Sequence, residues 1–165
     1  MLYIFGGLPG TGKSTLSHHL SRKLKAVHLR VDTIEHALRE AGANLAGPEG
    51  YNIAYRIAED NLQLGLHVVA DSVNPLQVTR TAWREVATRN GVPFVEIEVV
   101  CSNETEHRAR VESRVADIAG FRLPTWDEVI NRMYEPWDAE RLLIDTAGQT
   151  PEQSIAALER ALASR

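Results

Sequence analysis

The sequence predicts an α/β fold in three layers, with a parallel β-sheet between two layers of helices. Short apolar runs alternate along the chain with longer stretches that suit helices. The apolar runs contain few polar residues, which is typical of strands that are covered on both faces. The chain has 165 residues, of which 44% are hydrophobic, an ordinary size and composition for one domain with a substantial core. We therefore expect a single domain over residues 1–165.

The elements follow from the N-terminus onward. Residues 2–5 form an apolar run that is too short for a signal peptide and stops at Gly6-Gly7, so it is the first expected strand. Further apolar runs predict strands over residues 26–31, 67–70, 94–100 and 142–144. The expected helices cover residues 13–24, 33–41, 51–64, 76–90, 104–115, 125–134 and 152–163.

Glycine and proline mark several of these boundaries. Gly65 and Gly91 each follow an expected helix, where glycine commonly ends one. Pro75 and Pro151 stand where a first helical turn tolerates proline. Because strands and helices alternate in this order, parallel strands joined by crossover helices are favoured.

Composition and charge restrict the surroundings and the partners of the protein. Cys101 is the one cysteine, which excludes an internal disulfide and makes a reducing, cytoplasmic location the expectation. No apolar run is long enough to span a bilayer. The formal net charge is −4, and the arginines between residues 108 and 122 alternate with acids, as on a solvated helix face. Nucleic acid is therefore not an expected partner.

A phosphate-binding motif is the most informative feature of the chain. Residues 7–14, Gly-Leu-Pro-Gly-Thr-Gly-Lys-Ser, match G-x-x-x-x-G-K-[ST] at every fixed position. An apolar strand precedes the motif and a helix follows it, so backbone N–H groups and the positive helix end can surround a triphosphate. We expect it to bind ATP as its magnesium complex. The nucleotide-binding residues are expected to be Gly7, Gly10, Thr11, Gly12, Lys13, Ser14 and Thr15.

Two residues are candidate magnesium ligands. The hydroxyl of Ser14 follows the lysine of the motif, where such a hydroxyl binds the cation. Asp71 ends the apolar run over residues 67–70, so it is expected at the carboxyl edge of the sheet, where ligands of open α/β sheets bind. The alternative for Asp71 is a cap of the loop that leads into the helix after Pro75.

Asp32 is a candidate catalytic residue. It follows the second expected strand, so its carboxylate would face the same edge of the sheet and could accept a proton from an attacking hydroxyl. The alternative is local. Asp32-Thr33-Ile34-Glu35 also matches a capping box, with Asp32 as the N-cap.

Arg114 is the candidate for stabilising charge on a phosphoryl group in transfer, because it ends a helix that leads into a stretch with little core pattern, residues 115–124. A similar stretch covers residues 42–50, and both could move over a site. The alternative for Arg114, and for Arg110 and Arg122, is an exposed arginine that pairs with nearby acids.

Taken in order, residues 7–15, Val31-Asp32, residues 68–72 and Arg114 resemble the P-loop kinases grouped as AAA-type predicted kinases. That group is similar to gluconate kinase, zeta toxins, chloramphenicol phosphotransferase and the kinase domain of polynucleotide kinases. The resemblance implies a nucleoside-kinase-like fold, with a five-stranded parallel sheet in the order 2-3-1-4-5 and a lid at about 115–138. It also places Asp32 at the position of the family's catalytic aspartate.

One departure from the family concerns the acceptor. Many relatives, including polynucleotide and toxin kinases, have an arginine three residues after that aspartate, where this chain has Glu35. The expected reaction is transfer of the γ-phosphoryl group of ATP to a hydroxyl of a small molecule, with Lys13, Asp32 and Arg114 as catalytic residues. The alternatives are a polynucleotide 5′-hydroxyl kinase and a nucleotide-switched binding module.

Overall fold

A five-stranded parallel sheet with the strand order β2-β3-β1-β4-β5 forms the centre of the protein. The structure is a computed structural model that describes residues 1–45, 47–116, 120 and 122–165. The strand order confirms the predicted sheet. The strands are β1 (Leu2–Gly6), β2 (Val27–Arg30), β3 (Val68–Asp71), β4 (Phe94–Val100) and β5 (Leu142–Asp145).

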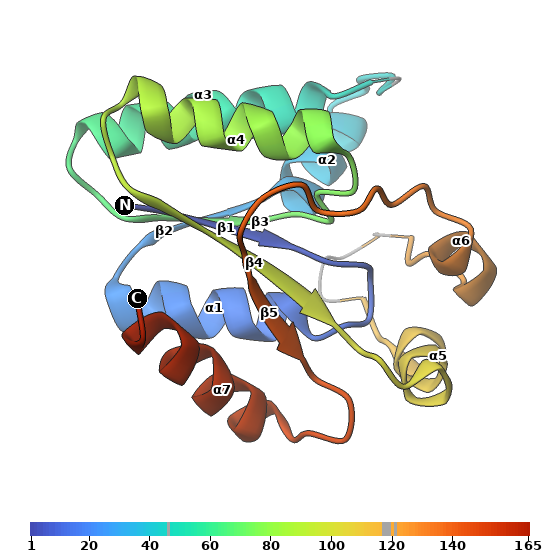
Figure 1. Cartoon of the computed structure of the whole chain (residues 1–165). Helices are drawn as coiled ribbons and strands as arrows, with labels where there is room; N and C mark the ends of the chain where they lie inside the picture. Colours follow the sequence, from blue (N-terminus) through green and yellow to red (C-terminus); the bar gives the residue numbers. More distant parts are fainter. Residues whose placement is uncertain (46, 117–119, 121) are drawn as a thin grey trace.

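Helices cover both faces of the sheet, as the three-layer prediction requires. One face is covered by α2, α3 and α4, and the other by α1 and α7 (Figure 1). Two short helices, α5 and α6, lie beyond the carboxyl ends of the strands (Figure 1). The helices are α1 (Lys13–Leu24), α2 (Val31–Glu40), α3 (Glu49–Gln63), α4 (Gln77–Arg89), α5 (Glu104–Ser113), α6 (Trp126–Ile130) and α7 (Pro151–Ala163).

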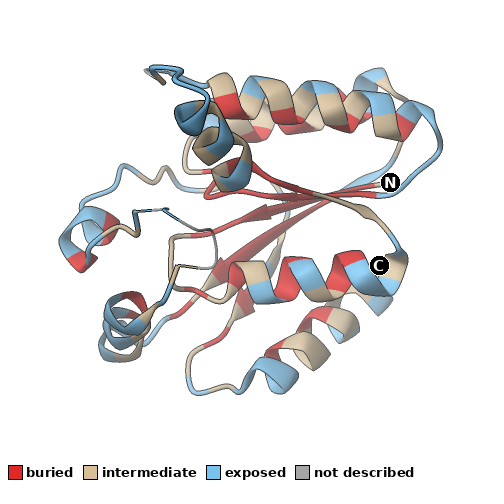
Figure 2. Ribbon diagram, turned by 180° about the vertical axis from the view of Figure 1, so that it is seen from behind, coloured by how far each residue is buried: buried red, intermediate tan, exposed pale blue. Residues whose placement is uncertain are grey.

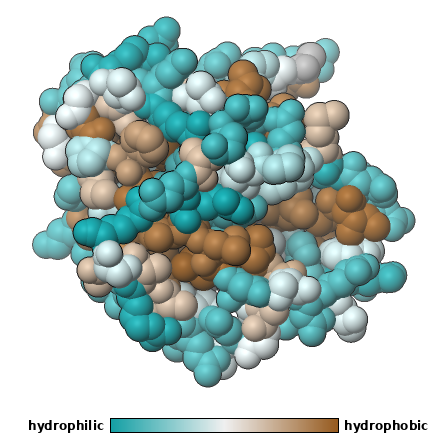
Figure 3. All heavy atoms as spheres, in the orientation of Figure 1, coloured by the Kyte–Doolittle hydropathy of each residue, from teal (hydrophilic) through white to brown (hydrophobic). Residues whose placement is uncertain are grey.

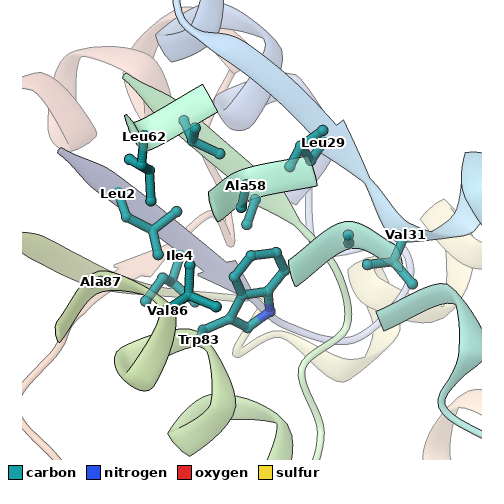
Figure 4. Packing of buried hydrophobic residues seen from close by; sticks show 12 residues of the cluster. Leu2, Ile4, Leu29, Val31, Ala58, Leu62, Trp83, Val86 and Ala87 are labelled. Atoms are coloured by element: carbon teal, nitrogen blue, oxygen red, sulfur yellow. The ribbon is translucent and has the colours of Figure 1, made fainter. Parts of the chain in front are cut away.

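The core has two halves because side chains of each strand alternate between the two faces of the sheet. Along β1, Leu2 and Ile4 pack towards α3 and α4, whereas Tyr3 and Phe5 pack towards α1 and α7. Figure 4 shows the first half, in which Leu2 and Ile4 lie close to Trp83 of α4. Figure 2 shows the buried residues concentrated in the strands and on the inner sides of the helices. This burial on both faces explains the continuous apolar runs of the sequence.

Most of the surface in the view of Figure 1 is hydrophilic, and hydrophobic residues gather near its middle, where the edge strand β5 lies (Figure 3). Leu143 of β5 is 56% exposed. No helix in the described part of the chain is both long and apolar enough to cross a membrane.

The start of α2 differs from the prediction. Strand β2 ends at Arg30, which is the N-cap of α2, and helical geometry begins at Val31 with no side chain capping the helix. Asp32 therefore lies in the first turn of α2 instead of at the end of the strand, and the predicted capping box from Asp32 to Glu35 is wrong. The strand passes directly into the helix without a loop. Val31, the first residue of the helix, is buried like the last two residues of the strand before it.

Helix α6 is shorter than the predicted helix over residues 125–134. It begins as expected, with a capping box between Thr125 and Glu128, but ends at Ile130. The following segment packs on α4 instead of continuing as a helix. The fully buried Arg80 donates hydrogen bonds to the carbonyl groups of Glu135 (3.0 Å) and Pro136 (2.9 Å), and these tertiary contacts hold the segment against α4.

The predicted lid, about residues 115–138, includes residues 117–119 and 121, which lie outside the described part. Its last residues are anchored. The guanidinium of Arg80 lies 4.8 Å from the centre of the Trp137 ring, and Arg84 pairs with Asp138 at 2.6 Å. A segment that closes over the site would therefore have to end before residue 135.

Candidate nucleotide and acceptor site

The phosphate loop connects β1 to α1 and lies at the carboxyl edge of the sheet. Its glycines allow a close approach to neighbouring backbone and side chains. A Cβ atom on Gly7, whose φ is +141°, would lie 2.2 Å from the carbonyl oxygen of Val99. A Cβ atom on Gly10, whose φ is +86°, would lie 2.5 Å from Cγ2 of Val111. Larger residues at either position would push the loop away from its support.

Beneath the loop, Lys13 and Asp71 form a buried ion pair. The ammonium of Lys13 lies 2.7 Å from Oδ1 of Asp71, and the hydroxyl of Ser17 donates a hydrogen bond of 2.9 Å to Oδ2. Burial acts to raise the pKa of Asp71, but the charge and hydrogen bond of Lys13, with the hydrogen bond of Ser17, outweigh it and lower this pKa to about 2. Asp71 is therefore a carboxylate at neutral pH.

The oxygen donors of Ser14 and Asp71 fit magnesium, which prefers hard oxygen ligands. Ser14 lines the cavity along the loop. Asp71, the last residue of β3, is buried and is joined to the loop by its ion pair with Lys13. Within the described residues, no group of three or more His, Cys, Asp or Glu side chains could hold a metal ion by itself. A cation here would take much of its coordination from phosphate and water, as magnesium commonly does.

Two cavities meet above the loop. A cavity of about 340 Å³ follows the loop, and one of about 780 Å³ lies beside it, between α2 and the segment around α6. The residues that line both are Pro9, Asp32, Val73 and Arg114. The larger cavity has charged walls, which include Glu35, His36, Arg39, Glu40, Arg122, Glu128 and Arg132.

A third cavity, of about 350 Å³, opens on the other side of the loop. It is lined by Gly10, Gly12, Thr15, Leu16, Arg110, Thr146, Gln149, Pro151 and Ser154. Arg110 donates hydrogen bonds to the hydroxyl (2.8 Å) and carbonyl (2.9 Å) of Thr146, and it also pairs with Glu106 at 2.5 Å. Arg110 therefore forms a fixed wall of this cavity.

The structure brings most of the predicted nucleotide-binding residues to one cavity. Gly10, Gly12, Lys13, Ser14 and Thr15 line the cavity along the loop. Gly7 and Thr11 belong to the support of the loop. Gly7 donates its N–H to the carbonyl of Val73, and the buried Thr11 donates its hydroxyl to the carbonyl of Leu8 at 2.9 Å.

The candidate catalytic residues take different positions. Asp32, with a side chain 35% exposed, stands on the wall shared by the cavity along the loop and the larger cavity beside it. Arg114 lies there too and has no hydrogen bond or ion pair with the described residues. Arg110 pairs with Glu106, and Arg122 pairs with Glu128.

The sequence reasoning did not include Thr146 or Gln149 among the functional residues. Both lie in the loop after β5, at the same edge of the sheet as the phosphate loop. The signal that could have found them is positional, since Thr146 follows directly after the last strand, where ligands of open α/β sheets bind.

Comparison with known proteins gives the family. Residues 2–136 match the model of a family described as AAA domain. A probable adenylyl-sulfate kinase of Aeropyrum pernix is 27% identical over 159 residues, which cover 92% of this chain and 86% of the relative.

Two solved structures have the same fold. A putative kinase from Chloroflexus aurantiacus has a TM-score of 0.74 at 24% identity, with 99% of this chain and 96% of that chain covered. The APS kinase of Mycobacterium tuberculosis, solved in complex with AMPPNP and APS, has a TM-score of 0.68 at 22% identity, with 98% and 96% covered. The family match spans most of the chain and contains the phosphate loop, and the chain therefore belongs to the AAA domain family of nucleotide-binding P-loop kinases.

Proposed function

We propose that this protein transfers the γ-phosphoryl group of magnesium-ATP to a hydroxyl group of a small-molecule acceptor. The observation that supports this most directly is the meeting of two cavities at Asp32 and Arg114. The cavity along the phosphate loop suits the triphosphate, and the larger cavity has room for a second substrate. A phosphoryl group that passes from one to the other must pass these two side chains.

The nucleotide would extend from the third cavity to the phosphate loop. Its base and sugar would lie among Arg110, Thr146 and Gln149, and its phosphates would accept hydrogen bonds from the loop. Lys13 would exchange its bond to Asp71 for one to phosphate oxygens. Ser14 and Asp71 would hold magnesium, which neutralises charge on the phosphates during transfer. The loosened Asp71 carboxylate is then free to accept hydrogen bonds from water bound to the cation.

Asp32 would orient the attacking hydroxyl and accept its proton, since it stands where the acceptor meets the phosphates. Arg114 would stabilise the charge that develops on the phosphoryl oxygens. Its freedom from other partners in the described part of the chain supports this role, because no ion pair has to break first.

The acceptor would be a small polar molecule. Two ion pairs stand in the wall of the larger cavity, Glu35 with Arg39 and Arg122 with Glu128, and Nε2 of His36 lies 3.5 Å from the carboxylate of Glu40 in the same wall. Such walls offer hydrogen bonds of both polarities to a hydroxylated molecule. Because a relative is named a probable adenylyl-sulfate kinase, adenylyl sulfate is the first acceptor to test.

The test measures ADP release from magnesium-ATP with a panel of acceptors, which includes adenylyl sulfate, sugars and nucleosides. With the acceptor that gives the fastest release, Asp32→Asn should lower turnover by about 10²-fold or more, because the proton acceptor is lost while the shape is kept. The matched control is Asp60→Asn, which changes an exposed aspartate of α3 far from the cavities.

Two results would contradict the proposal. One is ADP release that no acceptor in the panel accelerates, which would favour a nucleotide-switched module. The other is normal turnover of Asp32→Asn with the best acceptor, which would remove Asp32 from the mechanism.

A further inference from the structure

The carbonyl groups of the phosphate loop are held by side chains that surround it. In a trans peptide, the C=O of one residue and the N–H of the next point in opposite directions. A donor that holds a carbonyl on the outside of the loop therefore turns the next N–H inward. Thr146 holds the carbonyl of Thr11 in this way (2.8 Å), ahead of the N–H of Gly12. Thr11 holds the carbonyl of Leu8 (2.9 Å), which only supports the loop, because the next residue, Pro9, has no N–H.

The third such contact comes from α5 and is not part of the phosphate motif. Nε2 of His107 lies 2.8 Å from the carbonyl oxygen of Pro9. A carbonyl oxygen can only accept a hydrogen bond, so Nε2 must carry the proton. Pro9 and Gly10 line the cavity along the loop, whereas His107 is 7% exposed and lines none of the three cavities described above. The imidazole thus holds the peptide from the side away from the nucleotide.

We propose that His107 is a positioning residue for nucleotide binding, which holds the carbonyl of Pro9 outward so that the N–H of Gly10 points towards the phosphates. The inference rests on the proposed use of the loop for ATP. The donated hydrogen bond orders the Gly10 amide before the nucleotide arrives, so less conformational entropy is lost on binding.

Packing fixes the imidazole in place. The ring of Trp126 on α6 lies edge-on to His107, with ring centres 5.2 Å apart and an angle of 84° between the planes. Val111, one turn further along α5, supports Gly10, and Leu8 of the loop packs on the cluster of Val111, Trp126 and Val129. Two elements beyond the sheet edge therefore determine where His107 meets the loop.

Two substitutions separate the hydrogen bond from the packing. His107→Phe keeps an aromatic ring against Trp126 but has no N–H donor, whereas His107→Gln retains a donor at a similar distance from the backbone. Dissociation constants for magnesium-ATP and for adenosine are measured by calorimetry with both variants and the wild type. Adenosine serves as the control ligand, because it has no phosphate.

The loss of one neutral hydrogen bond should weaken magnesium-ATP binding of His107→Phe by about three- to tenfold. Adenosine binding should stay within about twofold of the wild type, and His107→Gln should recover most of the lost affinity. Unchanged ATP binding in His107→Phe, or an equal loss for ATP and adenosine, would overturn the inference. If the wild type itself failed to bind magnesium-ATP, that result would contradict the proposed function, which is a different outcome from normal ATP binding by His107→Phe.

A measurement on the wild type tests the hydrogen bond without any variant or nucleotide. Long-range ¹H–¹⁵N spectra of the histidine rings at about pH 8, where free imidazole is neutral, report which nitrogen holds the proton. The inference requires a protonated Nε2 on His107. A proton on Nδ1 alone would overturn it, whatever the affinities are.

Discussion

Lys13, the lysine of the phosphate motif, has a partner within the protein. Its ammonium is paired with the fully buried Asp71, so a phosphate must compete with a carboxylate for the same cation. In the proposed mechanism, this exchange would offset part of the attraction between Lys13 and the triphosphate and would release Asp71 towards a bound cation. The pair thus links phosphate binding to the state of the proposed magnesium ligand.

The Lys13–Asp71 pair should also make stability depend on pH. Folding lowers the pKa of Asp71 from its ordinary 3.8 to about 2, so the stabilisation is fully present above about pH 4 and is lost as the pH falls through this interval. Asp71→Asn should therefore show a flatter fall of unfolding free energy between about pH 4 and pH 2 than the wild type. Urea unfolding at a series of pH values measures the difference between the two proteins.

At neutral pH, Asp71→Asn should be less stable by about 3 kcal/mol, because the Lys13 ammonium is left without its carboxylate partner. This loss lies at the lower end of what breaking a buried ion pair costs, because Lys13 borders an open cavity in which water can solvate its ammonium. Parallel pH profiles for the two proteins would show that the carboxylate of Asp71 is not held in its charged form by the fold.

The elements differ in how far the sequence could predict them. Periodicity and flanking glycines located the strands, since burial on both faces leaves a plain apolar pattern. The strand order was implied by the resemblance to P-loop kinases and could not follow from periodicity. The predicted start of this helix, at residue 33, was wrong. Asp32-Thr33-Ile34-Glu35 suits a capping box as well as a first helical turn, and the local sequence pattern does not distinguish the two.

The end of α6 shows a second limit. Residues 131–134 could continue a helix, but tertiary contacts of Arg80 with residues 135 and 136 decide their course. Likewise, the contact of His107 with Pro9 joins residues 98 positions apart in the chain. Such contacts depend on topology, so the phosphate motif could be identified from the sequence whereas its supports could not.

The predicted lid should change on ligand binding, but only in part. With a non-hydrolysable ATP analogue, magnesium and an acceptor present, amide hydrogen exchange should slow over residues 122–133, because closure buries these amides. Residues 135–138 should exchange equally with and without ligands, since Arg80 and Arg84 already anchor them to α4. Mass spectrometry of peptic fragments can separate these two segments.

Residues 135–138 serve as the internal control for residues 122–133 in this exchange experiment. Slower exchange over both segments would place the end of the moving part beyond residue 138. Equal exchange everywhere, under conditions in which the analogue is bound, would show that residues 122–133 do not close over the site.

On the scale of the whole molecule, the candidate functional residues are concentrated at one edge of the sheet. The phosphate loop and the loop after β5 follow the carboxyl ends of strands, Asp71 is the last residue of β3, and α5 and α6 lie beyond the same ends (Figure 1). The opposite edge holds both chain termini (Figure 1). This arrangement follows from parallel topology, which brings the carboxyl ends of all strands together.

Charge on this scale favours a small acceptor over a nucleic acid strand. The formal net charge is −4, and Arg108, Arg110 and Arg122 each pair with a nearby glutamate. A protein that neutralises several backbone phosphates needs a surplus of unpaired cations, and its affinity falls steeply with salt as counterions are released. Paired arginines supply little of that attraction, since each already has an anionic partner.

We therefore expect only weak binding to single-stranded DNA or RNA at physiological salt, and slow labelling of a 5′-hydroxyl oligonucleotide by ATP. The assay follows radiolabel transfer from γ-labelled ATP to the oligonucleotide, beside adenylyl sulfate, sugars and nucleosides at equal concentration. At least one small acceptor should be labelled faster than the oligonucleotide by about tenfold or more, since each 1.4 kcal/mol of lost transition-state stabilisation reduces the rate tenfold.

Glu35→Arg is the informative variant, because it reverses the charge at a wall of the larger cavity and removes the pair with Arg39. If charge at this wall disfavours strands, the substitution should raise oligonucleotide labelling relative to small acceptors. Rapid labelling of the oligonucleotide by the wild type, with no small acceptor used, would instead establish the polynucleotide 5′-hydroxyl kinase.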